Sequence, residues 1–173
     1  MKKELFSNVL SLIWNLLIIY VCYSLCLLTF LLENFRLFSE NLTWGYALNL
    51  FGAGIIFDTT AILYSNALFI LLFLLPFHWK ENVKFYKVVR WIFTVVNGFF
   101  LIANLVDCVY FRFSGRRTTM SVFQEFGNEG GGNLASIFMT EFISHWYLVV
   151  LAIIFCYMIY KLYRSPRNIP VYS

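Results

Sequence analysis

The chain has 173 residues, of which 61% are hydrophobic and only 13% are charged, and its mean hydropathy is +0.74. Soluble domains are about 45 to 50% apolar, so this composition excludes a water-soluble globular protein and predicts an all-α, polytopic helical membrane bundle. The 20 Phe, 11 Tyr and 5 Trp suit lipid-facing helices with aromatic belts. The net charge of +4 comes from short basic runs between apolar segments, where it sets topology and does not indicate nucleic-acid binding.

The first predicted span covers residues 9–32, shortly after the basic residues Lys2 and Lys3. Its roughly two dozen residues exceed the ~7 to 15 of a signal-peptide core and match the ~20 that cross a bilayer. No small-x-small cleavage site closes the run, so we expect an uncleaved helix that enters the membrane from the cytoplasm. Asn8 and Asn15 lie on or near this helix, where an amide can hydrogen-bond to a neighbouring helix.

A short helix over residues 44–54 and a second span over residues 55–77 are expected next. Apolar side chains recur at helical spacing from Trp44 onward, which indicates a helix. Only about a dozen residues precede Asp58, however, and that is too few to cross a bilayer. We therefore expect residues 44–54 to form an interfacial helix that leads into the second span.

The third span is predicted over residues 88–111 and the fourth over residues 142–163. An extracytoplasmic loop over residues 112–141 connects them, and its glycines argue against a continuous helix. The three consecutive glycines at 130–132 are not followed by Lys-Ser/Thr, so they do not form a phosphate-binding loop.

Orientation follows from the distribution of the basic residues. Nine of the thirteen are cytoplasmic if both termini and the loop over residues 78–90 face the cytoplasm. A separate span over residues 44–58 would place that loop outside, against the positive-inside bias, so four spans are favoured over five. The basic residues left on the outer side are Arg36, Arg112, Arg116 and Arg117.

Asp58 and Asp107 lie near the outer ends of the second and third predicted spans. An acid at membrane depth is costly, so it indicates either a function or a structural partner. Arg112, Arg116 and Arg117 follow Asp107 by five, nine and ten residues and can supply that partner. In a structural interpretation these ion pairs fix the helix ends, whereas in a functional one the guanidinium groups bind an anionic lipid headgroup. Both interpretations stay open.

Complete catalytic or metal-binding sets are not found in the sequence. His78 and His145 are predicted on opposite sides of the membrane, and Glu141 with His145 forms a local pair that lacks the second histidine of HExxH. We therefore expect no catalytic residue, metal or cofactor within this chain. The cysteines form no CxxC pair and are interpreted as small apolar side chains within the helices. They are Cys22, Cys26, Cys108 and Cys156.

Two segments resemble the amino-terminal membrane domain of the lipoteichoic acid synthase and phosphoglycerol transferase family. They are residues 55–76, IIFDTTAILYSNALFILLFLLP, and, after the basic loop, residues 104–119, NLVDCVYFRFSGRRTT. The shared features are a glycine-rich FD helix, a span that ends in D-x-x-Y-F, and a basic F-S/T-G-K/R-R-T-T segment just outside the membrane. The individual matches are Asp58, Asp107, Tyr110, Arg116, Arg117 and Thr118.

The resemblance implies a multi-pass anchor in the bacterial cytoplasmic (inner) membrane for an extracytoplasmic catalytic domain of the alkaline phosphatase and sulfatase superfamily. That domain carries a threonine nucleophile and a divalent metal and acts on phosphate or sulfate esters. Family members usually have five spans, so a fifth span and the catalytic domain are expected beyond Ser173. Thr118 and Thr119 are therefore not the expected nucleophile.

The resemblance predicts a membrane domain that positions this catalytic domain at the cell envelope and binds an anionic lipid headgroup. The alternative is a self-contained small membrane protein, either a transporter subunit or an assembly partner, in which Asp58 and Asp107 form a polar pathway. These two hypotheses differ in whether the partner is the chain's own catalytic domain or another protein.

Overall fold

The computed structural model describes residues 2–38, 43–74, 83–114, 139–141 and 143–165. The predicted all-α fold is confirmed, and no β-strand occurs among these residues. The helices are α1 (Lys2–Glu33), α2 (Phe35–Phe38), α3 (Trp44–Ser65), α4 (Ala67–Leu74), α5 (Val83–Ser114) and α8 (Trp146–Leu162).

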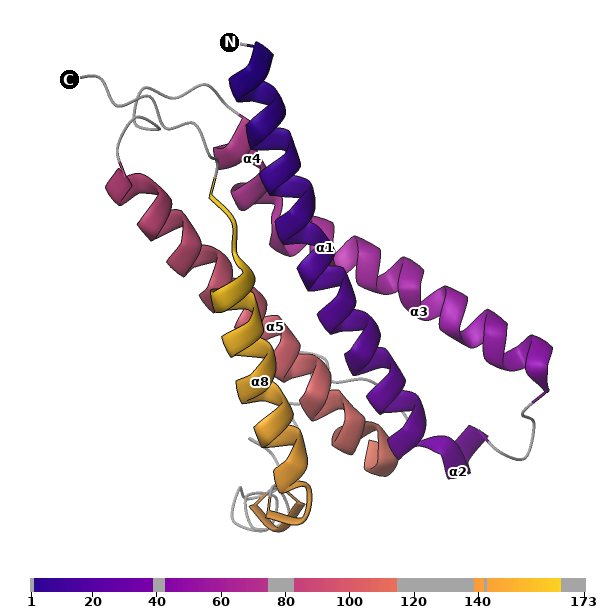
Figure 1. Cartoon of the computed structure of the whole chain (residues 1–173). Helices are drawn as coiled ribbons and strands as arrows, with labels where there is room; N and C mark the ends of the chain where they lie inside the picture. Colours follow the sequence, from indigo (N-terminus) through magenta and orange to yellow (C-terminus); the bar gives the residue numbers. More distant parts are fainter. Residues whose placement is uncertain (1, 39–42, 75–82, 115–138, 142, 166–173) are drawn as a thin grey trace, which may run out of the picture.

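The helices α1 and α5 form the long axis of the bundle, with α8 packed against both of them (Figure 1). Each of the two long helices has 32 residues, or about 48 Å at 1.5 Å per residue, which exceeds the ~30 Å hydrocarbon core of a bilayer. The start of α1, the end of α4 and the start of α5 lie at one end of the bundle (Figure 1). The α8 helix runs toward this end and stops short of it, level with Trp14 of α1 and Arg90 of α5. The described helices therefore make four passages along the bundle, with α3 and α4 together making the second.

Within the described part of the chain, three helical segments are long and apolar enough to cross a membrane, namely Phe6–Glu33, Trp44–Ser65 and Lys84–Phe111. The fourth passage, α8, is apolar but shorter, with 17 residues and a length of about 25 Å. Together with the apolar outer faces of these helices, this establishes a helical membrane bundle.

The structure contradicts the expected helix boundary near residue 55. One helix, α3, runs from Trp44 to Ser65, and the interruption comes at Asn66, whose backbone has φ −100° and ψ 7°. Thr43 caps the start of this helix, because its Oγ1 accepts a hydrogen bond of 3.3 Å from the Tyr46 amide. At the other end the Asn66 side chain donates to the Ile62 carbonyl at 3.0 Å and competes with the backbone. The interfacial location of residues 44–54 stays a prediction.

A second boundary also differs from the expectation. The α5 helix begins at Val83, so the last residues of the expected loop over 78–90 form the first turns of a helix. Lys84, Lys87 and Arg90 are therefore fixed on a helical surface at the end of the bundle.

The core is a set of stripes at i+3 or i+4 spacing, one from each passage. On α5 these buried residues are Val89, Phe93, Asn97, Leu101, Leu105 and Cys108. On α1 they include Leu12, Asn15, Ile19, Cys22, Cys26 and Phe30. The second passage contributes Asp58, Ile62, Asn66, Phe69 and Phe73, and α8 contributes Leu148, Phe155 and Ile159.

A reciprocal amide pair joins the second passage to α5. Asn66 Nδ2 donates to Asn97 Oδ1, and Asn97 Nδ2 donates to Asn66 Oδ1, both at 2.8 Å. The two side chains are 1% and 0% exposed. Each Nδ2 also donates to a carbonyl of its own helix, on Ile62 and Phe93, so both hydrogens of each amide are bonded. The pair fixes the helix interruption against the middle of α5.

We expect a double-mutant cycle on Asn66→Leu and Asn97→Leu, measured by unfolding in mixed detergent, to give a coupling free energy of about 1 kcal/mol. Either single change leaves the other amide buried without its partner, whereas the double change removes both polar groups. Asn104→Leu is the control, because Asn104 bonds only within its own helix, to the Phe100 carbonyl at 3.1 Å. Strictly additive effects of the two single changes would contradict an interhelical amide pair.

Candidate functional site

Asp58 lies in the contact between α3 and α1. Only 7% of its surface is exposed, and Ile62, one turn further along α3, is 0% exposed. Gly54 lies one turn before Asp58 and faces Leu27 of α1. Because residues i and i+4 share one face of a helix, the Asp58 side chain belongs to the face of α3 that packs on α1.

Gly54 sets how closely α3 approaches α1. A Cβ atom at this position would lie 2.7 Å from Leu27 Cδ2 and 2.8 Å from Leu27 Cδ1, closer than side chains normally pack. Gly52 has nothing within 4 Å of the same point, although it is on the same helix. Of these two glycines, Gly54 is the one whose Cβ position is occupied by another helix, and it lies one turn before Asp58 on the face of α3 that packs on α1.

Asp107 lies two turns before the end of α5 and is partly buried. Beside it, the Cys108 carbonyl accepts a hydrogen bond of 3.0 Å from Asn34 Nδ2, at the corner between α1 and α2. Phe30 and Phe111 meet edge to face one turn away, with ring centroids 5.0 Å apart. These contacts hold the end of α1 against α5 at the level of Asp107.

The start of α8 joins the same end of the bundle. The Tyr147 hydroxyl donates to Glu33 Oε1 at 2.5 Å. The predicted local pair of Glu141 and His145 is confirmed, with 3.4 Å between His145 Nδ1 and Glu141 Oε2. His145 Nδ1 also lies 2.9 Å from the Glu141 carbonyl oxygen. Glu33, Asp107 and the Glu141–His145 pair thus place acidic and titratable groups at this end.

The five predicted site residues are placed as follows. Asp58 and Asp107 belong to two helices, α3 and α5, that both pack on α1. Arg112 lies in the last turn of α5, where only its backbone is described. Arg116 and Arg117 lie outside the described residues. The pairing of these arginines with the two acids therefore stays a prediction.

The C-terminal end of α8 is bonded to α1 and α5 by polar contacts, and of the residues involved the sequence singled out only Asn15 for such a role. Asn15 Nδ2 donates to the Arg164 carbonyl, and the Arg164 amide donates to Asn15 Oδ1, both at 2.9 Å. Trp14 Nε1 donates to the Leu162 carbonyl at 3.1 Å. Arg90 of α5 donates to the Tyr160 carbonyl. The last carbonyls of a helix have no partner within it, and here two of them, on Tyr160 and Leu162, are bonded by other helices. Asn15 bonds the backbone of Arg164, just beyond the end of α8. The predicted interhelical role of Asn15 is confirmed.

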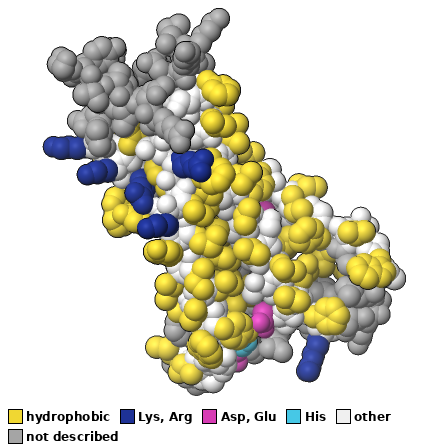
Figure 2. All heavy atoms as spheres, viewed as in Figure 1, with side chains coloured by type: hydrophobic (Ala, Val, Ile, Leu, Met, Phe, Trp, Pro, Cys, Tyr) yellow, Lys and Arg dark blue, Asp and Glu magenta, His cyan; other side chains and the backbone are white. Residues whose placement is uncertain are grey.

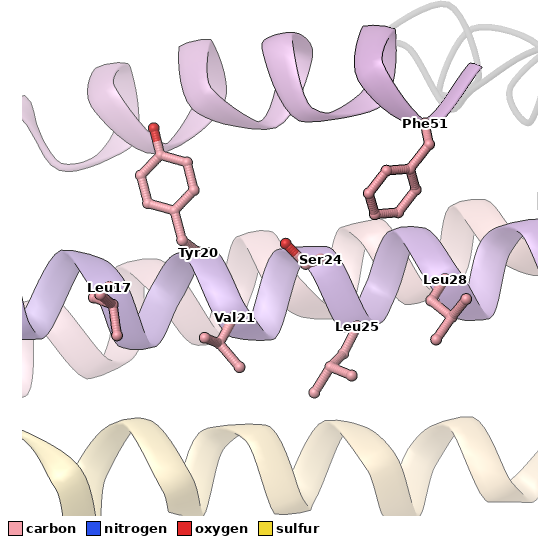
Figure 3. Close-up of a pocket in the computed structure, with 7 residues that line it drawn as sticks. All are labelled: Leu17, Tyr20, Val21, Ser24, Leu25, Leu28 and Phe51. Atoms are coloured by element: carbon pink, nitrogen blue, oxygen red, sulfur yellow. The ribbon is translucent and has the colours of Figure 1, made fainter. Parts of the chain in front are cut away.

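A shallow groove of about 350 Å³ runs between α1 and α3 (Figure 3). Tyr20 points from α1 toward α3, and Phe51 points from α3 toward α1 (Figure 3). The lining contains no acidic or basic side chain and no His or Cys, so it offers neither a metal ligand nor a general base. The lining residues are Leu17, Tyr20, Val21, Ser24, Leu25, Leu28 and Phe51.

Within the described ranges, no three His, Cys, Asp or Glu side chains come together as possible metal ligands. No family model, curated protein or solved structure matches this chain.

We expect Gly54→Leu to lower the free energy of unfolding by about 1–3 kcal/mol, because the new side chain overlaps Leu27 and separates α3 from α1. Adding Leu27→Ala makes room and should recover most of the loss. Gly52→Leu is the matched control on the same helix and should change stability by less than about 0.5 kcal/mol, because its position is open. Equal losses for Gly52→Leu and Gly54→Leu, measured by unfolding in mixed detergent, would show that the α1–α3 contact does not depend on Gly54.

Proposed function

We propose that this chain is the membrane-anchor domain of an enzyme similar to phosphoglycerol transferases and sulfatases. It positions an extracytoplasmic, metal-dependent catalytic domain at the membrane surface. The observation that carries the proposal is the resemblance of residues 55–76 and 104–119 to the lipoteichoic acid synthase and phosphoglycerol transferase family. The helical membrane bundle supports it, because α5 continues without a break through the first part of the second segment to Ser114.

The charge distribution supports an orientation with the N-terminus in the cytoplasm of a bacterial cell. The start of α5 and the end of α8 bring five basic residues to one end of the bundle, which we call the basic end. In Figure 2 most of the Lys and Arg side chains gather at this end, while acidic side chains, His and a further basic side chain appear toward the opposite end. The positive-inside rule favours a cytoplasmic basic end, with the end of α5 and the start of α8 outside. The five residues are Lys84, Lys87, Arg90, Lys161 and Arg164.

Lipid capture at the outer end is the second part of the proposal. Three arginines follow the membrane-embedded part of α5, namely Arg112, Arg116 and Arg117. A guanidinium group can donate two parallel hydrogen bonds to the oxygens of one phosphate group. A headgroup held there is already located at the membrane surface. A catalytic domain anchored by the same chain then meets its lipid substrate at a high effective concentration.

A second candidate function is favoured by the burial of Asp58. An acid that is 7% exposed inside a membrane bundle suits a polar pathway in a transporter subunit or assembly partner. The two candidate functions can be separated by following the reading frame past Ser173. The anchor proposal requires a reading frame that continues past Ser173 into a further span and a soluble domain, whereas a stop codon there would remove it.

We expect Arg116→Glu with Arg117→Glu in the full-length protein to lower turnover of a lipid substrate at least about tenfold, since each change replaces an attractive charge by a repulsive one. Turnover of a soluble ester should stay within about twofold of the wild type, because the distant catalytic domain is unchanged. Arg36→Glu is the control on the same predicted side. An equal loss on both substrates would argue against headgroup capture.

The orientation can be tested by cysteine labelling in intact cells. In a background without the four native cysteines, a membrane-impermeant maleimide should label Glu125→Cys and should not label Lys84→Cys until the membrane is permeabilised. The physical reason is the excess of basic residues on the side that contains Lys84. The reverse labelling pattern would overturn the orientation.

A further inference from the structure

A basic and aromatic surface lies where the start of α5 meets the end of α8. Lys84, Lys87 and Lys161 are all exposed there, and Trp91 is 60% exposed. Figure 2 shows that the Lys and Arg side chains at this end lie directly beside a broad apolar face. The acids Glu33 and Glu141 belong to the opposite end of the bundle, next to the start of α8.

Arg90 fixes the geometry of this surface and does not itself extend from it. Its guanidinium group donates to the Tyr160 carbonyl and lies 3.8 Å from the centroid of the Tyr160 ring. The Trp91 ring centroid is 5.7 Å from the same ring, so Tyr160 of α8 contacts two consecutive residues of α5. Cation–π and ring contacts of this kind stabilise the junction. They hold the two helices that carry the lysines in a fixed arrangement.

Apolar side chains continue from the lysines toward the middle of the bundle. Trp91 and Val95 on α5 are 60% and 61% exposed, and Ile153 and Tyr157 on α8 are 64% and 62% exposed. From Lys87 to Val95 the helix rises about 12 Å, most of the ~15 Å depth of one leaflet's hydrocarbon. Charge near the start of the helix and apolar surface below it match the two parts of a phospholipid.

We propose that this surface binds an anionic phospholipid of the adjoining leaflet, with its phosphate group at Lys84, Lys87 and Lys161 and its acyl chains along Trp91 and Val95. The exposed cations provide the charge complementarity, and lysine stems can reach along apolar surface to the headgroup level. The site is at the opposite end of the bundle from Arg112, so it does not depend on the proposed function. A nucleic acid or an acidic peptide would satisfy the lysines but would leave the apolar side chains below them uncovered.

The test uses the purified chain in detergent micelles that contain equal amounts of phosphatidylglycerol and phosphatidylcholine with the same acyl chains. Lipid retained on the protein is counted by native mass spectrometry. We expect the wild type to retain mainly phosphatidylglycerol. Each cation near an anionic surface contributes roughly a factor of five, so each single Lys→Gln change should weaken retention about fivefold. The combined variant Lys84→Gln, Lys87→Gln and Lys161→Gln should weaken it about a hundredfold.

Arg36→Gln removes one positive charge at the opposite end and should leave retention unchanged. Excess glycerol phosphate should not displace the lipid, because a soluble headgroup lacks the acyl chains. The proposal is overturned if the wild type retains both lipids equally or if the triple variant retains phosphatidylglycerol as the wild type does. It is also overturned if Arg36→Gln has as large an effect, or if glycerol phosphate competes fully, since that would indicate a site for a free anion.

Discussion

The rest of the structure depends on how its buried polar side chains are bonded inside an apolar solvent. In hydrocarbon, an unbonded amide or carbonyl costs several kcal/mol, so a partner for such a group stabilises the contact that supplies it. Four asparagines that are at most 1% exposed donate through their side-chain amides at three helix contacts, although Asn34 Oδ1 accepts no hydrogen bond among the described residues. Asn15 joins α1 to the end of α8, Asn34 joins the end of α1 to α5, and Asn66 with Asn97 joins the second passage to α5. The apolar residues fill the space between these fixed points.

The two ends of α3 are attached unequally to the rest of the bundle, because the buried polar contact lies at only one of them. Its last turns are held by the Asn66–Asn97 pair and by the close approach of Gly54 to Leu27. Its first turn is capped locally by Thr43, and Trp44 is 88% exposed there. This helix therefore departs obliquely from α1 toward its start (Figure 1). Asp58 lies on the attached part, so its position is set by packing and not by the exposed first turns.

The sequence predicted the class of fold because composition and segment length depend directly on the bilayer. It predicted less of the packing, because the helices are apolar on all sides. Leu17 is 52% exposed and Ile18 is 5% exposed, although the two side chains are chemically alike. Hydrophobic periodicity therefore does not separate the lipid-facing side from the buried one. The interruption at Asn66 was missed for a related reason, since several polar residues of the second passage were equally plausible breaks.

The sequence singled out Asp58 as an acid at membrane depth, and its ion pairing stays a prediction. The local pair of Glu141 with His145 follows from their spacing. The role of Arg90 could not be predicted from residue type and spacing, because a basic residue next to a span is first interpreted as a signal for topology. In the structure it bonds the Tyr160 carbonyl and stacks on the Tyr160 ring. Such a contact joins residues 70 positions apart, so it depends on helix packing that local sequence does not specify.

The polar contacts at the two ends of α8 tie the shortest passage to α1. At its start, Tyr147 bonds Glu33 of α1, and just beyond its end Asn15 bonds the backbone of Arg164. The reciprocal pair of Asn66 with Asn97 ties the second passage to α5 in the same way. Because each of these bonds satisfies a polar group that hydrocarbon cannot satisfy, sliding or rotating one of these helices against its neighbour would break it. The polar contacts therefore fix the register of the helices, which apolar packing alone specifies less closely.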